Sequence, residues 1–273
     1  MPPQAHQGRV AGRHWDPQQY LKFADHRLRP ALELLERIPL TAPQVIYDLG
    51  CGAGNVTRLL ANHWPEAAVY GVDSSPEMLA KAAAEPSSIH WAEANIQDWL
   101  PPQPPDLIYS NATLQWLDGH QTLFPRLLHC LNPGGCLAVQ VPLSWGMPPH
   151  RLMRETLADS GPGGQPLGDT TLRTAVARKW VEDAEVYYDL LAASTASLDI
   201  WETEYLQVLT GQEAVLEWVK STGLRPILTG LPESEREVFL TAYRQRLDTL
   251  YPRRADGHTL YPFRRLFIVA VKA

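Results

Sequence analysis

Residues 45–55 read VIYDLGCGAGN, and this stretch decides the fold. A short, mostly apolar run ends in Asp48, a glycine-rich turn follows, and a helical pattern begins directly behind it. Gly50, Gly52 and Gly54 permit a tight turn and let a ligand approach the backbone closely. The start of the helix presents unpaired backbone N–H groups to that ligand. This strand–turn–helix context predicts a site for a nucleotide-like ligand.

The alternation of apolar runs with helical segments continues as far as Pro142. Strands are expected at 45–49, 68–73, 88–91, 106–110 and 136–141. Near-continuous apolar strands separated by crossover helices predict a parallel sheet covered on both faces. Right-handed crossovers make such a sheet doubly wound. The predicted fold class is therefore α/β, with a mostly parallel sheet.

The alternation stops after Pro142, and helical segments dominate the rest of the chain. Helices are expected at 150–160, 171–179, 183–193, 211–221 and 233–251, and strands at 198–208 and 266–271. The last two strands bring the expected sheet to seven, and the inserted helices form a lid over one end of it. The predicted organisation is a flexible arm at 1–13, N-terminal helices covering the site at 14–44, a cofactor-binding core at 45–142, and a substrate lid with completion of the sheet at 143–273.

Composition excludes several classes of protein. The chain has 273 residues, of which 45% are hydrophobic and 20% charged, and this balance excludes wholesale disorder. The net charge of −6, without a Lys/Arg cluster, predicts no nucleic-acid partner. No apolar run approaches the ~18–20 residues that span a bilayer, so no membrane partner is expected. The first residues lack the apolar core of a signal peptide, which predicts a cytoplasmic protein.

The three cysteines, Cys51, Cys130 and Cys136, match no zinc-binding spacing. Each lies in an apolar or glycine-rich segment, so we expect small buried side chains in a reducing compartment and no metal site.

The acidic residues around the glycine turn narrow the kind of nucleotide. Asp73 follows Gly50 by 23 positions, close to the ~20 expected of a carboxylate that binds ribose hydroxyls. The turn is spaced G-x-G-x-G, whereas dinucleotide folds usually have G-x-G-x-x-G. Asp48 would also set a second anion near a pyrophosphate, but it suits a ligand with an ammonium group. A nicotinamide-dependent dehydrogenase is therefore disfavoured.

These motifs make the chain resemble the class I S-adenosylmethionine-dependent methyltransferases. The resemblance rests on D-x-G-x-G-x-G at 48–54, an acid after the second strand and Asn95-Ile96 after the third. Beyond these motifs, the chain is similar to members of this family that methylate small tricarboxylic acids, trans-aconitate among them. That similarity covers nearly the full chain and rests on WDPQQYLKF at 15–23, Arg29-Pro30, Asp73-Ser74-Ser75-Pro76 with Met78, NATLQW at 111–116 and RLFIVA at 265–270. It implies a Rossmann-like fold with S-adenosyl-L-methionine as cofactor.

The resemblance also implies which residues bind the cofactor. Glycines 50, 52 and 54 would lie against its methionine part, Asp48 near its ammonium and Asp73 on the ribose. The full set implied is Arg29, Asp48, Gly50, Gly52, Gly54, Asp73, Ser74, Met78, Asn95, Ile96 and Asn111. Ser74 and Met78 would flank the adenine. One departure stands at Asn95, where the family tends to have an acid; an amide oxygen can still accept from the adenine amino group.

The reaction implied is in-line displacement, in which an acceptor oxygen attacks the methyl carbon of a sulfonium. A carboxylic acid ordinarily has a pKa of ~4, so a carboxylate acceptor is ionised at neutral pH and needs no general base. We therefore expect no catalytic residue, only proximity and orientation. Arginines are expected to hold the non-reacting carboxylates through their bidentate fork. The candidates for acceptor binding are Tyr20, Gln115, Trp116, Trp145, Arg151 and Arg265.

Two other functions stay open on the sequence alone. The acceptor could be another small dicarboxylic acid or a hydroxyl-bearing metabolite, and a hydroxyl would need a nearby base. The chain could also be a non-enzymatic module that binds the cofactor.

Overall fold

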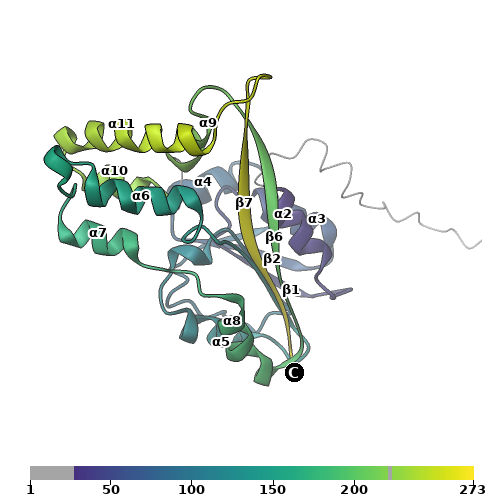
Figure 1. Ribbon diagram of the computed structural model, residues 1–273. Helices are drawn as coiled ribbons and strands as arrows, with labels where there is room; N and C mark the ends of the chain where they lie inside the picture. The colour runs from purple at the N-terminus through teal and green to yellow at the C-terminus, as the bar shows by residue number, and fades with distance from the viewer. Residues whose placement is uncertain (1–27, 221–222) are drawn as a thin grey trace, which may run out of the picture.

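The computed structural model describes residues 28–220 and 223–273 (Figure 1). The predicted arm, the first part of the N-terminal helices expected at 14–44 and the predicted site residue Tyr20 lie outside the described residues.

A seven-stranded sheet forms the centre of the molecule, in the order β3-β2-β1-β4-β5-β7-β6. Its strands are β1 (Val45–Leu49), β2 (Ala68–Asp73), β3 (His90–Glu93), β4 (Leu107–Asn111), β5 (Cys136–Pro142), β6 (Thr195–Thr210) and β7 (His258–Lys272). The first five strands pair in parallel, while β7 is antiparallel to both β5 and β6. The predicted α/β class with a mostly parallel, doubly wound sheet is confirmed.

Helices cover both faces of the sheet (Figure 1). One face carries α2 (Arg29–Glu36), α3 (Asn55–His63) and α4 (Pro76–Ala83), and the other carries α5 (His120–Cys130) and α8 (Ala184–Leu191). Each face has its own apolar layer. The layer under α2 and α3 includes Leu34, Ile46, Leu60, Tyr109 and Phe267. The layer under α5 and α8 includes Phe124 and Tyr187.

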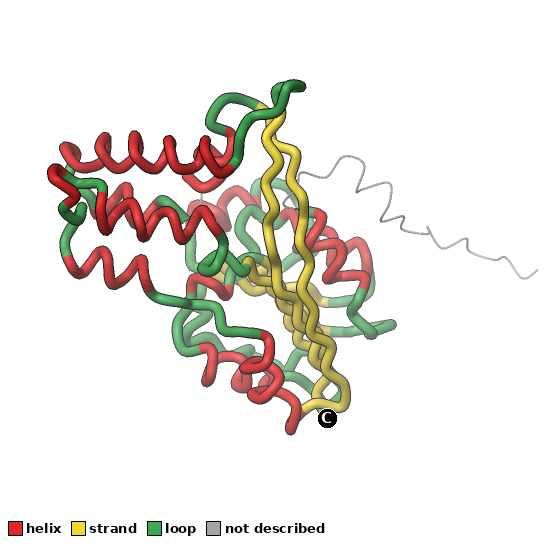
Figure 2. Tube along the Cα trace, in the orientation of Figure 1, coloured by secondary structure: helices red, strands yellow, loops and turns green. Residues whose placement is uncertain are grey.

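The remaining helices form a separate group beside the upper part of β6 and β7, as Figure 2 shows. They are α6 (Pro148–Asp159), α7 (Thr170–Ala177), α9 (Ala214–Lys220), α10 (Arg225–Gly230) and α11 (Glu233–Leu250). A third apolar cluster holds them together and includes Met153, Leu216, Phe239 and Tyr243. Tyr261 and Phe263 of β7 belong to the same cluster, so the strand ties this group to the sheet.

β7 and α10 differ most from the sequence expectation. β7 begins at His258, eight residues before the strand expected from Leu266, because its first half pairs with β6 in a two-stranded arm. Polar residues such as Thr259 and Arg265 interrupt the apolar pattern there, although both are buried. α10 was not expected; it is only six residues long and has Pro226 in its first turn.

All three cysteines are free thiols, with Cys51 and Cys136 buried and Cys130 half-buried. In the part of the chain that the structure describes, no helix is both long enough and apolar enough to cross a membrane.

Candidate functional site

The glycine turn lies where the strand order reverses, between β1 and β4. In open α/β sheets this switch point forms the ligand-binding crevice. The backbone N–H groups of Gly50 and Cys51 both donate to the carbonyl oxygen of Val72, at 2.7 and 3.1 Å. The turn is therefore folded back onto the end of β2.

Two glycines of the turn face different surroundings. Gly50 has a φ of +78°, and a Cβ there would lie 2.1 Å from the side chain of Thr113, so this glycine is required for packing. Gly52 has a φ of +53°, and a Cβ there would meet no atom of the described residues within 4 Å. Gly52 thus borders open space, as a residue that lies against a ligand should.

Asp73 at the end of β2 holds the turn in place. Its Oδ2 accepts from the N–H of Gly52 at 2.8 Å, and its Oδ1 accepts from the N–H of Ser75 at 2.9 Å. Ser75 is the N-cap of α4, and its hydroxyl accepts from the N–H of Met78 at 3.3 Å. Each carboxylate oxygen can accept more than one hydrogen bond, so Asp73 keeps capacity for two ribose hydroxyls.

Asp48 is 2% exposed and lies beneath the turn. Its Oδ2 accepts a hydrogen bond of 2.6 Å from the hydroxyl of Thr57 on α3. Burial raises the pKa of Asp48 to about 7; the Thr57 hydrogen bond lowers it and the negative charge of Asp73 raises it further. A cation bound near this carboxylate would favour its ionised form.

The segment after β4 closes the other side of the crevice. Ala112 has a φ of +55°, an uncommon conformation for a residue with a side chain. The hydroxyl of Thr113 donates to the carbonyl oxygen of Gly50 at 3.2 Å, so this segment touches the glycine turn. Asn111 and Gln115 each leave a buried amide oxygen (Oδ1 and Oε1) without a hydrogen-bond partner among the described residues. A ligand with hydrogen-bond donors could satisfy both oxygens.

Of the four residues predicted around the adenine, Ser74 follows β2, Met78 is on α4, and Asn95 and Ile96 follow β3. Ser74 and Met78 are exposed, and Met78 is 38% accessible. Asn95 is also exposed, and its Oδ1 accepts from the N–H of Gln97 at 3.0 Å. Ile96 is buried at 6%.

A buried pair, formed by an amide and a guanidinium, connects β5 and β7. Gln140 of β5 is fully buried, and Arg265 of β7 is 5% exposed. Nη1 of Arg265 donates to Oε1 of Gln140 at 3.1 Å. The guanidinium also lies 4.8 Å from the ring centre of Phe263 and 6.0 Å from that of Tyr205.

Arg29 lies at the far end of this face. Its guanidinium is 5.0 Å from the ring centre of Tyr205 on β6, and its Nε is 2.7 Å from Oε1 of Glu33. The Tyr205 hydroxyl donates to the other oxygen of Glu33. Since β6 is four strands from β1, Arg29, which is predicted to bind the cofactor, lies beside a strand far from the glycine turn.

The polar groups of the sheet form one line across its carboxyl edge. Side chains alternate between faces along a strand, so residues two apart share a face. In the layer under α2 and α3, buried residues lie two positions before Asp48, Asn111 and Gln140. Phe267 of the same layer lies two positions after Arg265. These four polar side chains therefore share the face of the sheet that α2 and α3 cover. We name this line the polar row; it consists of Asp73 (β2), Asp48 (β1), Asn111 (β4), Gln140 (β5) and Arg265 (β7). It runs from two carboxylates, through two amides, to a guanidinium.

Three other predicted acceptor residues lie at the surface. Trp116 is 55% exposed, and Trp145 is 40% exposed with its Nε1 donating to the carbonyl oxygen of Ala177 at 2.9 Å. Arg151 is exposed on α6 and pairs with Glu155 one turn away at 3.2 Å.

The sequence reasoning missed Gln140, Thr57, Thr113 and Tyr205. Gln140 could have been found, because it is the one polar side chain in the apolar run CLAVQV at 136–141. Nothing in the local pattern marks the other three, since their partners Asp48, Gly50 and Glu33 come from other elements.

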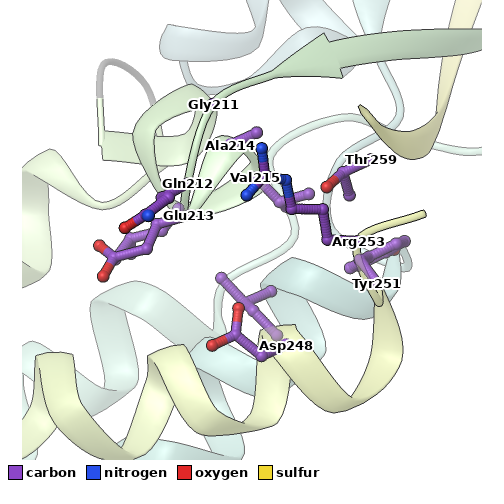
Figure 3. A pocket seen from close by; sticks show the side chains of 11 residues that line it. Gly211, Gln212, Glu213, Ala214, Val215, Asp248, Tyr251, Arg253 and Thr259 are labelled. Atoms are coloured by element: carbon purple, nitrogen blue, oxygen red, sulfur yellow. The ribbon is translucent and has the colours of Figure 1, made fainter. Parts of the chain in front are cut away.

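A cavity of about 320 Å³ lies apart from the polar row (Figure 3). The end of β6, the start of α9 and the end of α11 enclose it, with Glu213, Asp248 and Arg253 among its lining residues. Thr259 of β7 also lines the cavity. It lies six residues before Arg265, so about 20 Å of strand separates the cavity from the polar row. None of the predicted site residues that the structure describes lines this cavity.

Solved structures of low sequence identity share the fold. A phosphoethanolamine N-methyltransferase from Haemonchus contortus, in complex with S-adenosyl-L-methionine, superposes with a TM-score of 0.51 at 18% identity. The match covers 89% of this chain but only 52% of that structure, so this chain spans about half of it. The YcgJ protein of Bacillus subtilis gives a TM-score of 0.56 at 13% identity and covers 89% and 98% of the two chains.

Closer relatives are found by sequence. A methyltransferase domain model matches residues 46–135. The chain is 48% identical to the trans-aconitate 2-methyltransferase of Pseudomonas paraeruginosa, over 94% of both chains. It is 50% identical to the trans-aconitate 2-methyltransferase of Streptomyces avermitilis, over 94% of this chain and 97% of that one. These identities confirm the predicted class, and the chain belongs to the trans-aconitate 2-methyltransferase family of S-adenosylmethionine-dependent enzymes.

Proposed function

We propose that this enzyme transfers the methyl group of S-adenosylmethionine to one carboxylate of trans-aconitate and forms a monomethyl ester. The observation that carries the proposal is the charge order of the polar row. The cofactor is a cation at its sulfonium and ammonium, and the row begins with two carboxylates. The acceptor is a polyanion, and the row ends with the guanidinium of Arg265. Opposite charges at the two ends therefore match the two ligands of this reaction.

The residues at the carboxylate end fit the cofactor. When bound, S-adenosylmethionine supplies an electrophilic methyl group. Gly52 would lie against its methionine part, because no described side chain occupies the space in front of this residue. Asp73 would accept from the ribose hydroxyls, and Asp48 would stabilise the ammonium. Ser74, Met78, Asn95 and Ile96 would surround the adenine, with Asn111 near the sulfonium.

The Asn95 amide fits the adenine less simply than the sequence suggests. Its oxygen is engaged by the N–H of Gln97, so it can offer only its second lone pair to the adenine amino group. A weaker contact at this rim leaves the ribose and the ammonium as the main contacts with the cofactor.

The acceptor needs no base if it is a carboxylate. A carboxyl of pKa ~4 is ionised at neutral pH and attacks as the free anion. The buried His120 has both ring nitrogens engaged, Nδ1 with the Tyr187 hydroxyl at 2.6 Å and Nε2 with the Leu114 carbonyl at 2.9 Å. These two contacts leave His120 unavailable to deprotonate a hydroxyl.

The chain contributes alignment and charge placement. Arg265 would hold a non-reacting carboxylate of the acceptor, while Gln115, Trp116 and Trp145 would bound the acceptor from the segment after β4 and from the start of the lid. Holding two reactants in line can supply ~7–11 kcal/mol of the barrier in well-aligned cases. Attack by an anion on a cation neutralises charge, so exclusion of water favours the transition state.

The test uses purified enzyme, S-adenosylmethionine labelled in its methyl group, and trans-aconitate. We expect the label in a base-labile ester whose formation saturates with acceptor. Stabilisation by S-adenosylhomocysteine without any labelled ester would leave the cofactor assignment standing and overturn the acceptor.

A further inference from the structure

We propose that Gln140 binds a non-reacting carboxylate of the acceptor and so sets the preference for a tricarboxylic acid. This inference rests on the proposed function and deepens it, because it assigns a specificity role to a residue that none of the motifs includes.

The orientation of the Gln140 amide follows from the chemistry of its neighbour. A guanidinium only donates hydrogen bonds, so the atom that faces Nη1 of Arg265 at 3.1 Å must be the amide oxygen. The amide nitrogen of Gln140 must then face away from Arg265. Arg265 thus fixes which way the two N–H groups of Gln140 point.

Those N–H groups have no partner among the described residues. Gln140 is fully buried, and its Nε2 makes no hydrogen bond within the part of the chain that the structure describes. Buried donors in native proteins are nearly always paired, and an unpaired one is costly. A pair of buried N–H donors beside a guanidinium is a suitable site for a carboxylate.

The position of Gln140 suits a non-reacting carboxylate of the acceptor while another carboxylate of the same molecule is being methylated. Gln140 is in register with Asn111, and its backbone oxygen accepts from the N–H of Ala112 at 2.9 Å. Neighbouring strands lie ~4.8 Å apart, so Gln140 is one strand, and Arg265 two strands, from the point where the methyl group is expected. A six-carbon tricarboxylic acid can extend over that distance.

The immediate surroundings would strengthen binding of an anion there. Phe263 lies against the Arg265 guanidinium, and the neighbouring residues of β5 are buried and apolar. Charge-assisted hydrogen bonds are stronger in such a low-dielectric setting than in water.

The experiment measures KM for trans-aconitate, KM for S-adenosylmethionine and affinity for S-adenosylhomocysteine in Gln140→Glu and Gln140→Leu. Gln140→Glu keeps the shape and the bond to Arg265 but replaces the donor by a negative charge. We expect it to raise KM for trans-aconitate ~100-fold and Gln140→Leu to raise it ~10-fold, as loss of a hydrogen bond to a charged group predicts. Both cofactor constants should stay within about twofold, since Asp73 and Asp48 are untouched.

A second acceptor distinguishes specificity from a general defect. A dicarboxylic acid that lacks one non-reacting carboxylate should be a poorer substrate than trans-aconitate for the wild type. Gln140→Leu should reduce this difference at least fivefold, on the order of one lost hydrogen bond. A purely structural role for Gln140 would lower kcat for both acceptors alike and leave their ratio unchanged.

Gln103→Glu is the matched control. It makes the same chemical change at an exposed residue before β4, at the opposite edge of the sheet. Its KM values should equal those of the wild type.

Unchanged KM for trans-aconitate in both Gln140 variants would overturn the inference and indicate that a water molecule satisfies the amide. If either variant no longer binds S-adenosylhomocysteine, Gln140→Asn replaces it. Asn keeps the amide but is shorter by one methylene group, so this variant must also raise KM for trans-aconitate. A wild type that methylates no tricarboxylic acid would overturn the proposed function instead.

Discussion

The two ends of the polar row differ in how their charged groups are held. At the carboxylate end, the partners of Asp73 and Asp48 lie 2 to 21 residues away along the chain, in the glycine turn and the helix starts. At the guanidinium end, Arg265 reaches Gln140 across 125 residues. The carboxylate end is thus built from one continuous strand–turn–helix–strand unit, and the guanidinium end is assembled from strands that meet only in the folded protein. If the ends serve different ligands, substitutions at one should leave the binding constants of the other unchanged.

The largest effect is expected from Asp73→Ala. It removes the acceptor of the ribose hydroxyls and also the bond that orders Gly52. Two charge-assisted hydrogen bonds predict at least ~100-fold weaker binding of S-adenosylhomocysteine by calorimetry. Asp189→Ala, an exposed carboxylate on α8, is the control. Unchanged affinity in Asp73→Ala would remove the cofactor assignment from this end of the row.

Arg265→Met tests the opposite end. It keeps a long apolar stem beside Phe263 but removes the charge, so KM for trans-aconitate should rise ~30-fold or more while affinity for S-adenosylhomocysteine holds. Steady-state kinetics with each substrate varied in turn separates the two. An equal loss in both constants would show that the ends of the row are not independent.

Asp48 predicts a pH dependence confined to the cofactor end. The native pKa of about 7 lies above that of an unfolded aspartate, so between pH 4 and 7 the native state binds more protons than the unfolded state. The free energy of unfolding therefore falls as pH rises through this window. Asp48→Asn lacks this dependence. The free energy of unfolding of Asp48→Asn minus that of the wild type should therefore be on the order of 2 kcal/mol larger at pH 8 than at pH 5.

Denaturant titrations of both proteins at the two pH values measure that difference, with S-adenosylhomocysteine affinity followed in parallel. Wild-type affinity should rise with pH through 7, because ionised Asp48 attracts the ammonium. A stability difference that does not change with pH would contradict the raised pKa.

Gly52→Ala separates binding from packing within the glycine turn. Its Cβ meets no atom of the described residues, so the main expected result is ~10-fold weaker binding of S-adenosylhomocysteine, with a loss of ~1–2 kcal/mol in stability from the left-handed φ. Gly50→Ala, whose Cβ would collide with Thr113, should instead lower the Tm. Thermal melts with and without ligand distinguish the two glycines; equal ligand affinity in Gly52→Ala and wild type would contradict the contact.

The smallest effect is expected from Arg151→Ala. The guanidinium is exposed and paired with Glu155 on the same helix, and such pairs contribute less than ~1 kcal/mol. KM for trans-aconitate should change less than ~3-fold. A change as large as that of Arg265→Met would place Arg151 in the acceptor site after all and extend the basic end of the row to the lid.

Local sequence predicted the elements of the carboxylate end well because those elements are contiguous in the chain. The turn at 50–54, the strand before it and the acid after the next strand each follow from the conformational freedom of glycine and the alternation of apolar runs. Boundaries were less accurate where pairing, not composition, decides them. The third strand lies at His90–Glu93, two residues beyond the expected 88–91, because its partner β2 sets the register.

The guanidinium end of the polar row depended on the tertiary structure. The sequence identified Arg265 and Arg151 as acceptor-binding candidates without ranking them, since both are flanked by segments expected at the carboxyl ends of the parallel strands. Only the pairing of β7 with β5 buries one beside Gln140, while helix α6 leaves the other in solvent.

The sequence by itself determined the parallel sheet and the glycine turn with its two aspartates, because backbone freedom and hydrophobic periodicity are properties of contiguous residues. The tertiary structure alone decided that the Gln140 amide contacts the Arg265 guanidinium. It also decided that Asp48 is buried, which raises the pKa of its carboxyl to about 7. Both depend on strand order and burial, which residues distant in sequence create together.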